Sequence, residues 1–284
     1  MKQIRATAST AEKTVTPSRL AKLFAVAATT LIAASCATPP DRNPVPVGFE
    51  SLMTLEGYGQ IRIWGDREPD NVDASIAQIQ QQAAAAGRHV GPPSQRVASF
   101  LAISGGGSDG AYGAGLLNGW TDAGTRPEFD VVTGISTGAL TAPFAFLGSA
   151  YDDRLQAIYT QFGDDDLFEQ NSLPGIFGNA ALYDTAKLRG LIADFINPDV
   201  VAEIAREHNR GRRLLIGTAH LDAQRSVIWD IGAIASSNQP NKGELIHSIL
   251  TASAAIPGAF PAVRIQVVIN NQTYDELHVD GGTV

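Results

Sequence analysis

Residues 129–140 read FDVVTGISTGAL, and the rest of the sequence is interpreted from this stretch. A short β-branched run ends in a Gly-x-Ser-x-Gly turn centred on Ser136, and an apolar segment over residues 139–147 follows that is compatible with a helix. Strand, tight turn and helix is the context in which this pattern forms a nucleophile elbow, where the serine sits on strained backbone. Gly134 and Gly138 would let the strand and helix approach without side-chain collision. The stretch predicts Ser136 as a nucleophile, beside the free N–H groups of a helix N-terminus.

The composition favours a folded α/β protein and excludes several other classes. The chain has 284 residues of which 44% are hydrophobic, enough for the core of one large domain or two small ones. Only 18% are charged, which excludes a coiled coil or a disordered chain. Residues 1–35 hold five basic residues and one acidic residue, so the net charge of -8 leaves -12 for the remainder. Such an acidic body is not expected to bind nucleic acid.

Residues 1–35 are predicted to be a signal peptide of the lipoprotein type. Basic residues precede an apolar run over residues 23–34, which is too short to span a bilayer but suits a signal-peptide core. The following Ala-Ala-Ser-Cys resembles a bacterial lipobox, although Ala33 stands where leucine is usual. Cys36 is the only cysteine, so it has no disulfide partner and is the expected lipidation site. An ordinary secretory signal is the alternative.

The expected location is therefore the bacterial cell envelope. In this interpretation the protein is lipid-anchored to a membrane and faces the periplasm or the exterior. Residues 36–50 are rich in proline and are expected to form an extended tether. Residues 51–96 form an N-terminal extension, and residues 97–284 form the catalytic domain.

The remaining pattern alternates between strands and helices, as in a doubly wound α/β fold. Strands are expected over residues 60–64, 97–103, 214–219, 226–230, 263–269 and 274–279, and helices over residues 74–86, 152–162, 185–195, 199–208 and 243–251. The last two strands are expected to form a hairpin around Asn270 and Asn271.

A glycine-rich loop, SGGGSDG over residues 104–110, follows the strand at 97–103. It contains the G-x-G-x-x-G dinucleotide fingerprint, but the next strand ends at the serine turn and not at a ribose-binding acid. A phosphate-binding P-loop would need Gly-Lys-Ser/Thr, which is absent from the loop. The loop is therefore predicted to be an oxyanion hole built from Gly105, Gly106 and Gly107, whose N–H donors are each worth about 3 kcal/mol in the transition state. A side chain added at Gly106 is expected to block it.

These motifs, in this order, resemble those of the patatin-like phospholipases. The resemblance extends over roughly residues 97–284 and includes ASAAIPGAFP at residues 252–261 and the Asp280-Gly281-Gly282 motif. It implies a three-layer fold with a mostly parallel central sheet and helices on both faces. It also implies a serine-dependent acyl hydrolase that cleaves carboxylic esters of phospholipids or lysophospholipids, with no metal or cofactor. Ser136 would be the nucleophile and Asp280 the base of a Ser–Asp dyad, with Gly110 as the last glycine of the first motif.

The sequence departs from the family pattern at two points. Asp109 stands where the family often has arginine or lysine, so any stabilisation of the oxyanion by that cation is not expected. The sequence also ends two residues after Gly282, where relatives usually continue, which raises the alternative that it is a fragment.

Two alternative functions remain open from the residues alone. An α/β-hydrolase would use Ser136, then Asp222 or Asp230, then His247 or His278, although its usual His-Gly-Gly loop is missing. A non-catalytic surface lipoprotein could instead use the glycine loop to bind an anion or a nucleotide.

Other polar residues are assigned no chemistry. The aspartates at residues 164–166 are expected to be solvated and not to bind a metal, because no histidine or further carboxylate is spaced to join them. His89, His208 and His220 have no recognisable partner and are expected to be surface or capping residues.

Overall fold

The computed structural model describes residues 42–88, 97–160, 169–170 and 183–284. The expected signal peptide, Cys36, His89 and the aspartates at 164–166 lie outside these residues. Across these ranges, no helix combines the length and the apolar character needed to cross a bilayer.

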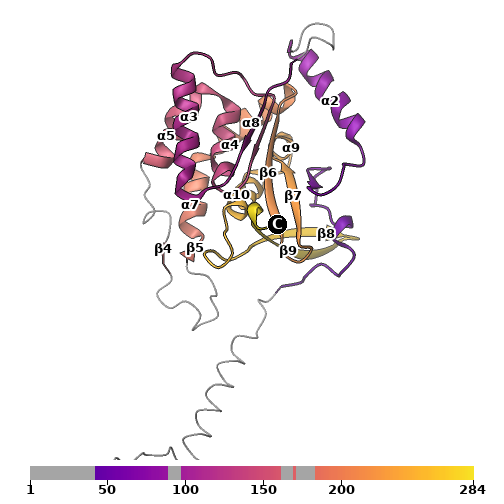
Figure 1. The fold of residues 1–284 in the computed structure, drawn as a ribbon. Coiled ribbons are helices and arrows are strands. Elements are labelled where there is room, and N and C mark those ends of the chain that lie inside the picture. Colours follow the sequence, from indigo (N-terminus) through magenta and orange to yellow (C-terminus); the bar gives the residue numbers. More distant parts are fainter. Residues whose placement is uncertain (1–41, 89–96, 161–168, 171–182) are drawn as a thin grey trace, which may run out of the picture. The chain divides into compact units, whose positions relative to one another are not determined.

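One seven-stranded sheet organises the described residues (Figure 1). Its main path runs in the order β1-β7-β6-β3-β2, and β9 pairs with both β6 and β8. The strands are β1 Arg62–Trp64, β2 Phe100–Ile103, β3 Val131–Gly134, β6 Arg213–His220, β7 Arg225–Asp230, β8 Val263–Ile269 and β9 Gln272–Asp280. A separate two-stranded ladder joins β4 Glu169–Gln170 to β5 Tyr183–Asp184.

The prediction of a mostly parallel sheet is wrong. Only the β2–β3 and β3–β6 pairs are parallel, whereas β1–β7, β6–β7, β6–β9 and β8–β9 are antiparallel. The physical reason is the length of the connections, because a parallel pair needs a crossover of about a dozen residues or more. Residues 221–224 alone join β6 to β7, and the β8–β9 hairpin turns at Asn270 and Asn271, whose φ angles are 49° and 60°. The expected hairpin is confirmed.

The helices on the sheet follow the predicted segments closely. They are α2 Val72–Ala85, α3 Gly110–Asp122, α4 Thr137–Leu147, α5 Asp152–Thr160, α7 Ala186–Phe195, α8 Pro198–Asn209, α9 Ile231–Ser236 and α10 Lys242–Ser253. The short α9 was not expected, because it follows β7 without an intervening loop. Its N-cap is Asp230, whose carboxylate accepts a hydrogen bond from the Ala233 N–H at 2.8 Å.

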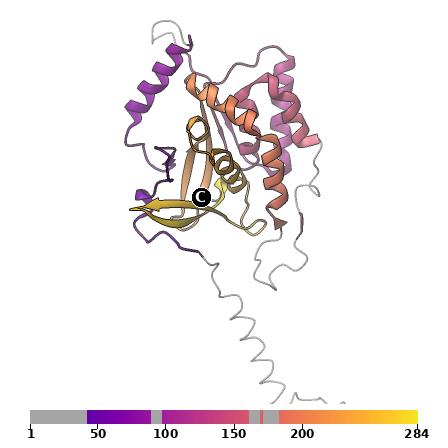
Figure 2. The same ribbon diagram turned by 180° about the vertical axis from the view of Figure 1, so that it is seen from behind.

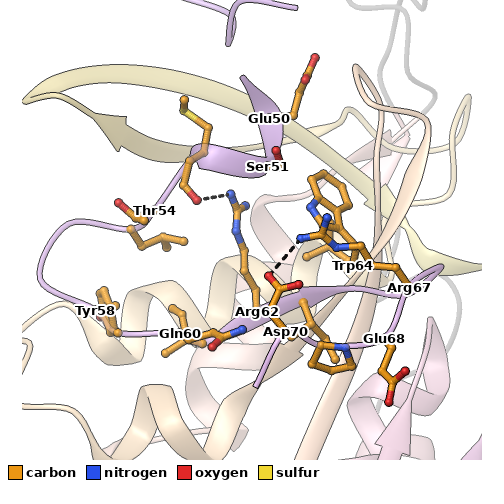
Figure 3. A pocket seen from close by; sticks show the side chains of 17 residues that line it. Glu50, Ser51, Thr54, Tyr58, Gln60, Arg62, Trp64, Arg67, Glu68 and Asp70 are labelled. Atoms are coloured by element: carbon orange, nitrogen blue, oxygen red, sulfur yellow. Dashed lines mark hydrogen bonds and ion pairs between the residues drawn. The ribbon is translucent and has the colours of Figure 1, made fainter. Parts of the chain in front are cut away.

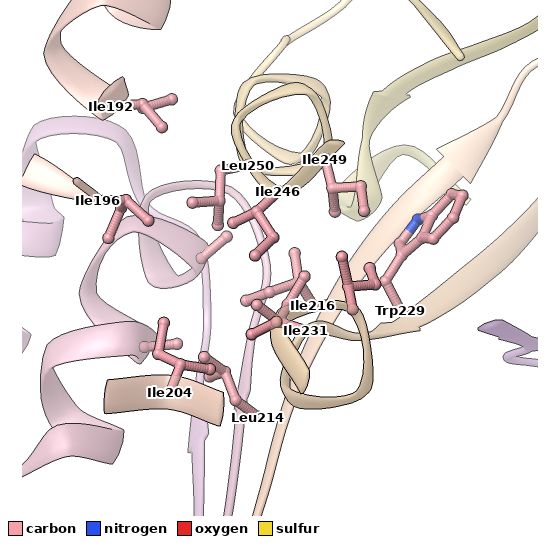
Figure 4. Packing of buried hydrophobic residues seen from close by; sticks show 14 of the residues in the cluster. Ile192, Ile196, Ile204, Leu214, Ile216, Trp229, Ile231, Ile246, Ile249 and Leu250 are labelled. Carbon is pink, nitrogen blue, oxygen red and sulfur yellow. The ribbon is translucent and has the colours of Figure 1, made fainter. Parts of the chain in front are cut away.

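The core lies between the sheet and α8, α9 and α10 (Figure 4). Leu214 and Ile216 of β6 and Trp229 of β7 are fully buried there. Their partners on the helices are Ile204, Ile231, Ile246, Ile249 and Leu250, all of which are also 0% exposed. Figure 2 shows the molecule from behind, with α10 beside the β8–β9 hairpin.

Helices were expected on both faces of the sheet, but one side of β2 is exposed. Phe100 is 72% exposed and Ala102 is also exposed, so among the described residues no helix covers their side of the strand. Strands β2, β3 and β6 follow one another in one direction across the sheet. Right-handed crossovers between such strands place the connecting helices on the same face.

The N-terminal part of the described chain is bound to the sheet. Strand β1 pairs antiparallel with β7, and Arg42 forms an ion pair with Asp222 at 2.7 Å. Val45 is 6% exposed and belongs to the core. The packed part of the chain therefore begins before residue 51, inside the segment expected to be a tether.

Arg62 of β1 links this N-terminal segment to β9. Its guanidinium donates to both carboxylate oxygens of the buried Glu276, at 2.5 and 3.0 Å. It also donates to the Met53 carbonyl at 3.2 Å (Figure 3). It also lies 5.4 Å from the ring centroid of Trp229. A cavity of about 360 Å³ lies beside Arg62, and its lining includes none of the candidate catalytic residues.

We predict that Arg62→Met lowers the free energy of unfolding by about 3 kcal/mol or more, because it leaves the Glu276 carboxylate buried and without its cation. Arg67→Met is the matched control, since Arg67 is half exposed and lies 3.6 Å from the exposed Asp70. That control should change the unfolding free energy by less than about 1 kcal/mol. Chemical denaturation of both variants measures the two unfolding free energies. Equal losses would show that the Arg62–Glu276 ion pair does not stabilise the fold.

Candidate active site

Ser136 occupies the sharp turn between β3 and α4. Strand β3 ends at Gly134 and α4 begins at Thr137, which confirms the expected strand, turn and helix. The φ angle of Ser136 is 57°, in the region that favours glycine, and a non-glycine residue there costs on the order of 1–3 kcal/mol. The residue is only 7% exposed. The surrounding structure therefore holds the serine in a strained backbone conformation, as a nucleophile elbow requires.

The two glycines of the turn are required by close backbone contacts. A Cβ atom on Gly134 would overlap the carbonyl oxygen of Gly138, and one on Gly138 would overlap the carbonyl oxygen of Ile103 in β2. No side chain fits at either position without moving backbone. Both glycines therefore have the role that the sequence predicted for them.

The glycine-rich loop lies directly against the nucleophile. A Cβ atom on Gly105 would lie 2.6 Å from Cβ of Ser136 and 3.1 Å from its Oγ. Within the described chain, the N–H groups of Gly105, Gly106 and Gly107 have no hydrogen-bond acceptor. These free donors belong to a loop that touches Ser136 at Gly105, as an oxyanion hole would need.

The expectation that a side chain at Gly106 blocks the loop is not supported by the packing, because Gly106 is not the tightest point. Its φ of 171° is extended backbone, and an added Cβ would meet nothing closer than Asp109 Cβ at 3.5 Å. Gly110, the last glycine of the motif, anchors the loop instead. A Cβ there would lie 2.8 Å from the Tyr159 hydroxyl and 3.0 Å from Thr137 Cβ.

Asp280 is the last residue of β9 and is 5% exposed. It pairs with Thr218 of β6, and its Oδ1 accepts a hydrogen bond from the Gly282 N–H at 2.8 Å. No donor among the described residues bonds to Oδ2. The Gly-Gly pair after Asp280 therefore orients one oxygen of the carboxylate and leaves the other free to accept a proton.

Neighbours of Ser136 and of Asp280 meet at Gly217 of β6. A Cβ on Gly281 would lie 2.6 Å from the Gly217 carbonyl oxygen and 3.1 Å from the Ile135 side chain. On the other side, Ser253 at the end of α10 donates to that same carbonyl at 2.7 Å and accepts from the Ser136 N–H at 3.1 Å. Residues far apart in sequence are thus brought to one place by β6.

The histidines of the alternative triad are engaged elsewhere. His278 is fully buried, with Nδ1 3.0 Å from Thr218 Oγ1 and Nε2 3.1 Å from Glu276. Burial lowers the pKa of His278 to about 4, although the Glu276 carboxylate acts to raise it. His247 Nε2 lies 2.8 Å from the Ile196 carbonyl. Within the described chain, neither ring forms a hydrogen bond with Ser136.

The acids of that triad also have other partners. Asp222 forms the ion pair with Arg42, and Asp230 caps α9. Two surface assignments are wrong as well. His208 is 6% exposed, with Nδ1 3.5 Å from Asp230, and His220 is 0% exposed.

His220, Glu276 and His278 form a buried cluster whose potential ligand atoms lie within 4.8 Å of one another. The hydrogen bonds oppose metal binding. The Ala223 N–H donates to His220 Nδ1 at 3.2 Å, so the ring proton lies on Nε2, 3.5 Å from Glu276. Burial would raise the pKa of Glu276, but the hydrogen bonds from His278 and Arg62, together with the nearby His220 ring, outweigh it and lower that pKa. Both carboxylate oxygens already accept hydrogen bonds from Arg62 or His278, and a metal ion would have to displace these donors.

The cluster was missed in the sequence, where its signal was the alternation along β9. Glu276 and His278 are two residues apart on β9 and so share one face of that strand, whereas His220 lies on the neighbouring β6. Pairing of His220 with His278 across the two strands completes the arrangement.

Comparison with known proteins gives one family and two groups of relatives. A family model described as "Patatin-like phospholipase" matches residues 101–284. Calcium-independent phospholipase A2-gamma of Rattus norvegicus is 26% identical over 206 residues, which cover 68% of this chain and 25% of that protein. Its Homo sapiens counterpart is 25% identical over the same extent. The chain thus spans about a quarter of the length of these relatives. Among solved structures, VipD from Legionella pneumophila matches with a TM-score of 0.43 and 14% identity, covering 66% of this chain and 46% of that chain.

We predict that Gly105→Ala lowers ester-hydrolysis kcat by about 100-fold or more, because its methyl group collides with Ser136 and displaces the donors. Gly106→Ala is the matched control on the same loop and should retain kcat within about fivefold. Steady-state kinetics with a soluble ester compares the two. If the Gly106 variant lost as much activity as the Gly105 variant, the contact of Gly105 with Ser136 would not explain the loss of kcat.

Proposed function

Because the chain belongs to the patatin-like phospholipase family, we propose that it is a serine-dependent hydrolase of lipid esters. The substrates would be carboxylic esters of phospholipids or lysophospholipids. The observation that carries the proposal is Ser136, held at a φ of 57° with Gly105 packed against its side chain. A strained serine beside free N–H donors is the arrangement that acyl transfer requires.

In the first half of the reaction, Ser136 Oγ attacks the carbonyl carbon of the ester. Its proton passes to Asp280, whose Oδ2 has no donor within the described chain. The carbonyl oxygen becomes an oxyanion, and the N–H groups of Gly105, Gly106 and Gly107 hold it. The tetrahedral species then collapses, so the bond to the alcohol breaks and Asp280 returns the proton to the leaving alcohol oxygen.

In the second half, water hydrolyses the acyl-enzyme. Asp280 accepts a proton from water, whose oxygen forms a new bond to the acyl carbon. Collapse breaks the ester to Ser136 Oγ, which takes the proton back from Asp280, and a free fatty acid leaves. Every proton is accounted for by one carboxylate, so this scheme requires no histidine.

The engaged histidines support a carboxylate base. His278 and His247 already bond to Glu276 and to the Ile196 carbonyl, whereas the Asp280 carboxylate keeps one oxygen free of protein donors. General base catalysis needs a group within hydrogen-bond reach of the hydroxyl. Gly281 and Ser253, which adjoin Asp280 and Ser136 respectively, both contact the Gly217 carbonyl, and this favours Asp280 for that role.

We predict that Ser136→Ala and Asp280→Asn each lower kcat by about 1,000-fold or more while the thermal transition stays cooperative. His247→Ala removes a histidine of the alternative triad and should leave kcat within about threefold. A fluorophosphonate probe should label the wild type and not Ser136→Ala. A folded wild type that the probe does not label would support the anion-binding alternative. An active Asp280→Asn variant would instead indicate that a histidine is the general base.

The location in the cell is a second part of the proposal. The basic leader, its apolar run and Cys36 support lipidation and anchoring to a membrane of the bacterial cell envelope. A lipid anchor would hold the enzyme at the surface where its substrates lie.

We predict that a metabolic fatty-acid label marks the wild type and not Cys36→Ser when both are expressed in a bacterium. The serine variant should move from the membrane fraction to the soluble fraction, since the acyl chains provide the attachment. Equal labelling of both proteins would exclude Cys36 as the acceptor.

A further inference from the structure

We infer that Ser253 is a positioning residue that sets the geometry between the nucleophile and its base, an inference that rests on the function proposed above. Ser253 is the last residue of α10 and is 0% exposed. It lies in the ASAAIPGAFP segment, for which the sequence analysis predicts no chemical role. Its hydroxyl joins the Ser136 N–H to the Gly217 carbonyl.

The direction of both hydrogen bonds is determined by the atoms involved. The Gly217 carbonyl can only accept, so the single hydroxyl proton of Ser253 is donated to it at 2.7 Å. The oxygen of Ser253 then accepts from the Ser136 N–H at 3.1 Å. The hydroxyl is thus held from two sides and cannot rotate without losing one bond.

This contact supports the strained backbone of the elbow. The Ser136 N–H is buried, and a buried donor without an acceptor is costly. If the turn rotated away from the Ser136 φ of 57°, the N–H would lose Ser253 as its acceptor and would be left unpaired. The bond also directs the Ser136 N–H toward Ser253, so the N–H is not available to an oxyanion.

The same segment also holds the base. Two residues after Ser253, the Ala255 carbonyl accepts a hydrogen bond from the Asp280 N–H at 2.9 Å. Residues 253–255 therefore bond to the backbone of Ser136 through a side chain and to the backbone of Asp280 through a carbonyl. A shift of this short segment changes the position of one catalytic residue relative to the other.

The test compares Ser253→Ala with Thr251→Val in full-length protein, using a soluble ester substrate. Thr251 is 1% exposed on the same helix, and its hydroxyl donates to the His247 carbonyl at 2.7 Å, within α10 itself. Ser253→Ala should lower kcat by about 10- to 100-fold with KM within about threefold, because the turn loses alignment and not binding area. Thr251→Val should leave both parameters within about twofold.

Ser253→Thr keeps the hydroxyl and should recover at least half of the lost activity on a logarithmic scale. Ser253→Cys fills a similar space with a weaker hydrogen-bonding group, and it replaces the alanine variant if that variant does not fold. Full kcat in folded Ser253→Ala or Ser253→Cys would overturn the inference, as would an equal loss in Thr251→Val. If the wild type is unlabelled by the fluorophosphonate, the proposed function itself fails. A labelled wild type with a fully active Ser253 variant rejects the positioning role alone.

Discussion

The backbone of α4 passes so close to the end of β2 that no side chain fits between Gly138 and the Ile103 carbonyl. This contact fixes where the first turn of α4 lies relative to the sheet. It brings Ser136 to the end of β3, and it brings the loop that follows β2 onto the serine, where Gly105 packs against its side chain. The strain at Ser136 is tolerated because the elements on either side are themselves held by the sheet. The positions of the proposed nucleophile and of its candidate oxyanion donors thus depend on one close approach of backbone.

A second requirement is that β9 hold its place at the end of β6, because Asp280 is its last residue. Three buried polar side chains lie on or beside this strand, and each has a defined partner. Arg62 neutralises Glu276, His278 bonds to Thr218, and the Trp229 indole N–H donates to the same Thr218 hydroxyl at 2.8 Å. Arg62 belongs to β1, which lies before the region matched by the family model at residues 101–284. The support of the base strand therefore includes residues outside the family motifs.

The local chemistry could be predicted from the sequence, whereas the long-range pairing could not. Ser136, Gly134 and Gly138 were found because each acts through neighbours within a few residues, so a short pattern carries the information. The parallel direction of the sheet was inferred from the alternation of elements, although the short connection at residues 221–224 already required an antiparallel pair. His220 is buried because β9, which is 52–60 residues later in the sequence, pairs with β6. The residues next to His220 in the sequence therefore do not predict its burial. Ser253 lies in the motif at residues 252–261, but its contacts with Ser136 and Gly217 form only when β3, β6 and α10 pack together.

In the proposed mechanism, two exclusions identify the groups that would stabilise the oxyanion. Asp109 stands where many family members have a cation, so no side-chain positive charge is supplied from that position of the loop. The Ser136 N–H is bonded to Ser253 and so cannot serve either. What remains is neutral: the backbone donors of the glycine loop, supplemented by the N-terminus of α4. Two such donors at about 3 kcal/mol each would supply about 6 kcal/mol, a large part of the barrier reduction that an enzyme needs. Because Asp109 is exposed, water and salt screen its charge, and the loop can stabilise an anion in spite of it.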